Sequence, residues 1–146
     1  MPFPTRELSN SEMEEFLKEN NTGILCFGGD EPYGIPMGFL YKKGTVILGF
    51  SRGGRKLACF QKSPKVCLTV CRPRKNSPDL KESCTTVILE GELGKVTDMS
   101  QYDLEKEFPK LPESIILFAL KVNKLGTKKC LQQPCEVLAG RERSKQ

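Results

Sequence analysis

Histidine is absent from the 146 residues of this sequence. Serine and cysteine hydrolases that depend on a histidine base therefore cannot be built from it. Zinc and haem sites with histidine ligands are excluded for the same reason, so a haem would need a cysteine, methionine or tyrosine ligand.

A Cys-x-x-Cys pair is also absent, although the chain has cysteines at positions 26, 59, 67, 71, 84, 130 and 135. An odd number of cysteines without such a pair fits reduced thiols better than a disulfide framework. Cys67 and Cys71 would lie roughly 13 Å apart on one strand, which is too far for one metal ion. Cys130 and Cys135 could approach each other in a turn, but two ligands without two partners are a weak signal. We therefore expect no metal site.

Long apolar runs are missing, since none approaches the roughly 20 residues that span a bilayer. The first residues also lack the apolar segment and cleavage pattern of a secretory signal, so we expect a soluble, cytoplasmic protein. The length and the 38% hydrophobic content fit a single domain over residues 1–146. A net charge of +5, from 23 basic and 18 acidic residues, is too small to demand nucleic-acid coating.

Acidic residues are missing from one central segment, between Glu31 and Asp79. Its basic residues are Lys42, Lys43, Arg52, Arg55, Lys56, Lys62, Lys65, Arg72, Arg74 and Lys75. Because nearby carboxylates would cancel a positive field, such a segment favours an anion site.

The basic turn Ser51–Lys56 lies inside this segment, after a strand-like run over residues 45–50 and before a short helical pattern. Glycines at 53 and 54 allow a close backbone approach to an anion, and the helix start offers unpaired N–H groups. Arg55 and Lys56 add charge and donors. The turn therefore predicts a phosphate site, with a solvated basic loop as the alternative.

Hydrophobic patterns predict a mainly β chain with short helices. Helices are expected over residues 9–20, 56–60 and 98–110, the first with a capping box formed by Ser9 and Glu12. Strands are expected over residues 23–27, 33–42, 45–50, 65–71, 85–96 and 114–122. Hairpin connections favour an antiparallel, Greek-key-like, six-stranded β-barrel. Its core would cover residues 5–128, followed by a basic C-terminal extension over 129–146 that frays at its end.

The order and spacing of four segments resemble the pyridoxamine 5'-phosphate oxidase-like split barrels, above all the nitroimidazole-resistance branch. The segments are Pro32–Tyr41, Thr45–Phe50, Gly54–Leu57 and Ser63–Val70. The resemblance implies an FMN-binding homodimer with two flavin sites at the subunit interface.

The resemblance also implies which residues hold the flavin. Arg55, Lys56 and Ser51 would bind the phosphate, and Phe50 would lie near the ring or the ribityl chain. The full set of implied cofactor-binding residues is Pro36, Met37, Gly38, Phe50, Ser51, Arg52, Gly54, Arg55, Lys56 and Thr86. Gly49 stands where nitroimidazole-resistance relatives often carry a histidine next to the flavin, so the resemblance does not extend to the reduction of nitro drugs. The catalytic residues are unknown.

The function expected from the resemblance is that of an FMN-dependent oxidoreductase with a small-molecule electron donor and acceptor. A non-catalytic module that binds flavin, deazaflavin or haem is the first alternative. A nucleic-acid-binding barrel that uses Tyr33, Phe39 and Tyr41 is the second. It is disfavoured because these three residues share one strand face, which is more simply a core or dimer face.

Overall fold

The computed structural model describes residues 4–72 and 83–131. Residues 73–82, between two of the expected strands, and most of the basic extension lie outside these ranges. The strands are β1 (Thr5–Arg6), β2 (Thr22–Phe27), β3 (Tyr33–Gly38), β4 (Leu40–Lys42), β5 (Thr45–Ser51), β6 (Lys65–Arg72), β7 (Thr85–Lys95) and β8 (Ile115–Cys130). The helices are α1 (Asn10–Glu19), α2 (Arg55–Lys62), the 3-10 helix η2 (Met99–Tyr102) and α3 (Leu104–Glu107).

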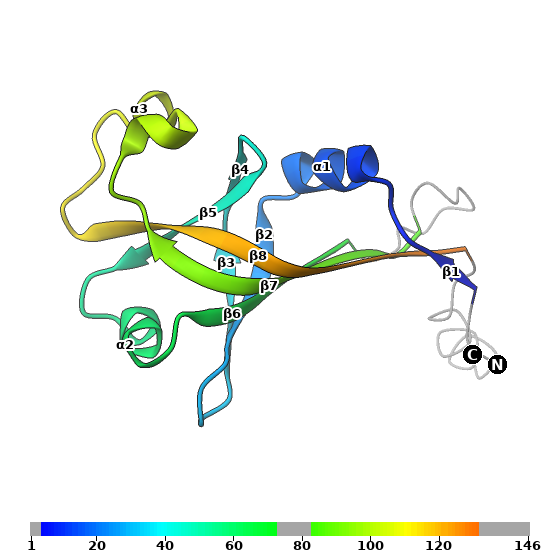
Figure 1. Ribbon diagram of the computed structural model, residues 1–146, viewed down its shortest axis with the longest axis horizontal. Coiled ribbons are helices and arrows are strands. Elements are labelled where there is room, and N and C mark those ends of the chain that lie inside the picture. The colour runs from blue at the N-terminus through cyan, green and yellow to red at the C-terminus, as the bar shows by residue number, and fades with distance from the viewer. Residues whose placement is uncertain (1–3, 73–82, 132–146) are drawn as a thin grey trace, which may run out of the picture.

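The described residues form one antiparallel sheet of eight strands, in the order β3-β2-β6-β7-β8-β5-β4, with β1 added to β8. The strongly curled β7 and β8 run the length of the sheet, with α2 near one end and β1 at the other (Figure 1). The expected β-barrel class is confirmed, but the sheet has eight strands and not six.

The two ends of the sheet order are consecutive in the chain, because β3 and β4 are separated only by Phe39. β3 pairs with β2, and β4 pairs with β5. The segment predicted as one strand over 33–42 thus changes partner at Phe39, whose N–H donates to the Asn21 carbonyl at 2.8 Å. This change of partner closes the curl of the sheet and leaves a split between β3 and the far half of β5.

Alternation along the strands places one side-chain set inside the curl. Leu25, Leu68 and Leu89 face one another across β2, β6 and β7, and each is at most 4% exposed. The odd-numbered residues from 33 to 41 join the same core, including Met37 in β3 and Phe39 between β3 and β4. The even-numbered residues of β3 therefore face outward.

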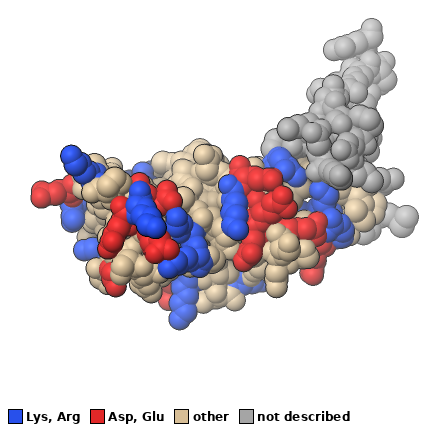
Figure 2. All heavy atoms as spheres, turned by 90° about the horizontal axis from the view of Figure 1, so that it is seen from above, with Lys and Arg blue, Asp and Glu red and all other residues tan. Residues whose placement is uncertain are grey.

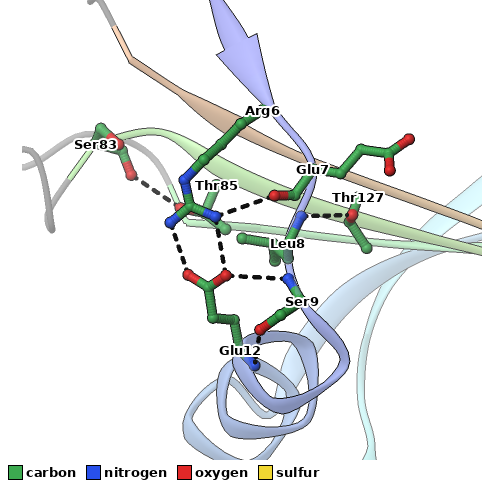
Figure 3. Close-up of polar contacts among 8 residues, drawn as sticks. All are labelled: Arg6, Glu7, Leu8, Ser9, Glu12, Ser83, Thr85 and Thr127. Atoms are coloured by element: carbon green, nitrogen blue, oxygen red, sulfur yellow. Dashed lines mark hydrogen bonds and ion pairs between the residues drawn. The ribbon is translucent and has the colours of Figure 1, made fainter.

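The first helix begins where the sequence predicted, and its capping box is present. Ser9 Oγ accepts from the Glu12 N–H at 3.2 Å, and Glu12 Oε1 accepts from the Ser9 N–H at 3.0 Å (Figure 3). The Glu12 carboxylate also receives two hydrogen bonds from the Arg6 guanidinium, at 2.9 and 2.7 Å. The Leu8 N–H donates to Thr127 Oγ1 at 2.9 Å, which joins the helix start to β8.

Two predicted element boundaries are wrong. The helix expected over 98–110 is divided into η2 and α3, because Asp103 adopts a left-handed conformation with φ of 54°. The last strand was expected to end at residue 122 but continues to Cys130, since its second half pairs with the first half of β7. Within the described ranges, no helix has the length and apolar character needed to cross a membrane.

Candidate functional site

The split lies where the β4–β5 pairing stops. Leu40 pairs with Ile47, and continuing that register would set Gly38 opposite Gly49 and Pro36 opposite Ser51. Instead β3 leans away to pair with β2, so these facing positions are left without a ladder between them. These four positions, which the sequence analysis had already singled out, thus lie on the two sides of the split.

The β3 side of the split is a flat strip. Its outward positions are Gly34, Pro36 and Gly38, all exposed, and none carries a large side chain. Glycine and proline in an edge strand leave backbone open to a close approach by a ligand. Met37, expected at the cofactor, is only 9% exposed and belongs to the core, so it can offer the site its backbone alone.

The β5 side of the split ends in two exposed residues, Gly49 and Ser51. Phe50 lies between them and points inward, where it is fully buried. Its ring packs against that of Phe118, with a centroid distance of 4.7 Å. Phe50 therefore lies beside the split, but in this arrangement it presents backbone and not its ring.

The turn after β5 exposes the start of α2. Gly53 has a φ of +78°, a conformation that favours glycine, and nothing lies within 4 Å of the position its Cβ would take. Gly54 is the N-cap residue and offers no side-chain cap, in contrast to Ser9 at α1. The first N–H groups of this eight-residue helix are thus left for another acceptor.

The two basic residues that follow begin α2. The Arg55 guanidinium carbon lies 4.0 Å from the centre of the Tyr33 ring, a cation–π contact that links α2 to the start of β3. Lys56 is half-buried. Among the described residues, neither takes part in an ion pair.

Other basic residues of the acid-free segment are paired in space. Lys42 contacts Glu107 at 2.7 Å and Lys43 contacts Asp103 at 3.1 Å, which joins the β4–β5 hairpin to α3. Figure 2 shows the face that bears α1 and α3, where basic and acidic side chains alternate. The pairing of these lysines leaves the turn before α2 as the more positive part of the segment.

Two of the expected site residues do not join the others. The Arg52 guanidinium donates to the Glu113 carbonyl, so this side chain is directed to the loop before β8. Thr86 pairs with Lys128, whereas Ser51 pairs with Ile115, and these two β8 positions lie roughly 40 Å apart along the strand. Within one chain, Thr86 and the basic turn therefore cannot contact one ligand.

A neighbouring hollow was missed by sequence reasoning. It has a volume of about 380 Å³ and lies between α2 and the β2–β3 turn. Arg55 lines it, together with Asp30 and Glu31. The acid-free segment is thus flanked in space by the two acidic residues that precede it, which linear spacing did not reveal.

The aromatic residues considered for base stacking point inward. Phe39 is 7% exposed and belongs to the core, and Tyr33 and Tyr41 pack against it. Burial raises the pKa of Tyr41, with the Glu14 carboxylate adding to the effect. These rings form no outward platform on which bases could stack.

Solved structures with the same fold include several cofactor-binding proteins. An FAD-binding protein from Mesorhizobium loti has a TM-score of 0.69 at 19% identity, and the alignment covers 90% of this chain and 100% of that one. A candidate 5-nitroimidazole antibiotic resistance protein from Bacteroides thetaiotaomicron has a TM-score of 0.69 at 16% identity, with 88% and 89% covered. A haem storage protein from Vibrio cholerae has a TM-score of 0.63 at 16% identity, with 82% and 94% covered.

A sequence comparison with curated proteins finds no match. The family model for pyridoxamine 5'-phosphate oxidase, however, matches residues 9–109, which is more than half of the chain. The matched range contains β3, β5 and α2, the elements that border the split. The chain belongs to the pyridoxamine 5'-phosphate oxidase-like family.

Proposed function

We propose that the protein binds FMN along the split between β3 and β5 and acts as a flavin-dependent oxidoreductase. Two observations support the proposal: β3 presents the flat, exposed strip of Gly34, Pro36 and Gly38, and the uncapped, basic start of α2 follows directly after the β5 residues that would face β3 in the continued register. A planar ring suits the strip, and a phosphate suits the helix start.

The residues have distinct roles in this proposal. Ser51, Arg55, Lys56 and the first N–H groups of α2 bind the phosphate. The Tyr33 ring holds the Arg55 guanidinium in place beside the gap. Asp30 and Glu31 repel an anion from the hollow beside α2, so the phosphate lies on the Ser51 side of Arg55.

FMN would supply the electron transfer itself, between a small-molecule donor such as a reduced nicotinamide and a second small molecule. The chain contributes position and charge. Its exposed backbone at Gly38 and Gly49 allows substrates to approach the open side of the split.

A second copy of the chain would complete the site. An outer stripe crosses the sheet from Pro36 through Ile24, Thr69 and Ile88 to Gly126, since each residue pairs with the next. Ile24 is 42% exposed and Ile88 is 37% exposed. The stripe begins at the split. Thr86 lies two residues before Ile88 on β7, so its side chain is on the same face of the sheet. A two-fold dimer across this stripe would bring the partner's Thr86 toward the split and cover the apolar side chains.

Haem is the competing ligand, because similar folds include haem proteins. The absence of histidine leaves only cysteine, methionine or tyrosine as iron ligands. Absorbance spectra after incubation with FMN, FAD, a deazaflavin and haem show which of these ligands binds. Binding of haem alone would contradict the flavin proposal.

The role of the basic turn is tested by replacing both Arg55 and Lys56 with alanine. Each lost charge-assisted contact costs about 1.5–3 kcal/mol, so the loss of both should lower FMN affinity by about a hundredfold or more. Riboflavin, which has no phosphate, should bind the wild-type protein and the double variant equally. Lys62→Ala is the matched control and should leave FMN affinity unchanged, because it removes a charge from the other end of α2. Equal losses for FMN and riboflavin would show that the phosphate lies elsewhere.

A further inference from the structure

Two thiols face each other on the outer surface of the sheet. Cys26 on β2 pairs directly with Cys67 on β6. Directly opposite residues of antiparallel strands have Cα atoms about 4.5–5.5 Å apart. A disulfide needs a Cα separation of about 4.4–6.8 Å, so the backbone already meets this requirement.

Both side chains border open space. Cys26 is exposed and Cys67 is half-buried. They line a hollow of about 420 Å³ together with Gly28, Lys65 and Glu90. The hollow gives a small oxidant access to the pair.

The two thiols differ in their surroundings. Burial raises the pKa of Cys67, and the nearby Glu90 carboxylate adds to this effect, while a contact with Thr69 Oγ1 at 3.9 Å opposes it. The Cys67 thiol is therefore harder to ionise than an ordinary cysteine. The exposed Cys26 is the thiol that an oxidant in solution meets first.

The Cys26 sulfur is directed to the opposite neighbouring strand in the structure. Cys26 Sγ lies 3.1 Å from the position that a Cβ would take on Gly34, so the sulfur leans toward β3. Turning it to another staggered rotamer directs it toward β6 without moving the backbone.

We propose that Cys26 and Cys67 form a reversible cross-strand disulfide, with a low-molecular-weight disulfide such as glutathione disulfide as the oxidant. The Cys26 thiolate attacks one sulfur of glutathione disulfide and releases a glutathione thiolate, which takes up the proton that Cys26 lost. The Cys67 thiolate then attacks the Cys26 sulfur and expels the second glutathione in the same way. Two protein thiols are oxidised, and one glutathione disulfide is reduced to two glutathione molecules. This site needs no flavin, so it goes beyond the proposed function.

The test is peptide mapping of the full chain after equilibration in graded mixtures of reduced and oxidised glutathione. A Cys71→Ser background is used because the tryptic peptide that contains Cys67 also contains Cys71. Free thiols are alkylated before digestion. The expected result is a peptide pair linked through Cys26 and Cys67 in oxidising mixtures, which separates again in excess reduced glutathione.

Two further variants define the result. Adding Cys26→Ser or Cys67→Ser to the Cys71→Ser background should abolish the linked pair and leave a glutathione adduct on the remaining thiol. The proposal would be overturned if Cys26 and Cys67 were alkylated separately in every mixture. It would also be overturned if a non-reducing gel showed that they are linked only between two chains.

Discussion

Gly49 is the residue where this chain departs most from the nitroimidazole-resistance pattern that it resembles. A Cβ at this position would lie 3.3 Å from Ile115 Cγ2 and 3.6 Å from Leu117 Cδ2, so a larger side chain fits after a small shift of Ile115. The position is exposed on the β5 side of the split. A histidine introduced there would point to the same face as Ser51.

We expect the wild-type protein to reduce nitroimidazoles slowly or not at all, although its bound flavin can be reduced chemically. Gly49→His should raise turnover, because a positioned general acid contributes about a hundredfold to ten-thousandfold. Steady-state turnover with a reduced nicotinamide measures the effect. Gly94→His, at an open position of β7, is the control and should change nothing. Fast turnover by the wild-type protein would show that the missing histidine does not limit this chemistry.

At the scale of the elements, the start of α1 combines a cap with an ion pair. The pKa of Glu12 is lowered to about 2, first by the hydrogen bonds from Arg6 and then by the bond from the Ser9 N–H. A carboxylate with a folded-state pKa below its ordinary 4.5 adds stability that is complete above that value. The contribution is lost as the pH falls toward 2.

Glu12→Gln should therefore flatten the dependence of the urea midpoint on pH between about 4.5 and 2. Unfolding of the wild-type and variant proteins, followed by circular dichroism at a series of pH values, measures this. Glu15→Gln removes a carboxylate of the same helix outside the network in Figure 3 and is the control. A wild-type slope equal to that of Glu12→Gln would mean that the Arg6–Glu12 pair does not persist in solution.

Local signals in the sequence predicted most of the elements. Ser9 and Glu12 predicted the start of α1, because a capping box is formed by residues only three positions apart in the sequence. The second half of β8 could not be predicted in this way. Residues 121–126 are all exposed, so no alternation marks them, and β7 supplies their partners from a distant part of the sequence.

The candidate site was predictable only in part for the same reason. The positive charge of Arg55 and Lys56 is evident from the sequence of the turn. The flat strip of β3 is equally evident from its glycines and its proline. That these features meet depends on the change of partner at Phe39, which is a property of the closed sheet. The direction of Arg52 toward Glu113 and the distance of Thr86 depend on tertiary structure as well.

For the whole molecule, we expect a dimer across the outer stripe. Replacing both Ile24 and Ile88 with lysine should yield a monomer with weakened FMN binding, because like charges would face each other across the two-fold axis. Light scattering and an FMN titration measure the two effects together. Val122→Lys alters an exposed apolar residue outside the stripe and should leave both unchanged. A wild-type monomer with fully bound flavin would contradict the shared site.

The central claim is that the split between β3 and β5 binds FMN, and an NMR titration of the labelled full chain with FMN tests it most directly. Glycine amides report on both sides of the gap. The account predicts saturable shifts at Gly34, Gly38, Gly49 and Gly54, with little change at Gly94. Shifts confined to the hollow that Gly28 and Gly29 line beside α2, or no shifts at all, would contradict it.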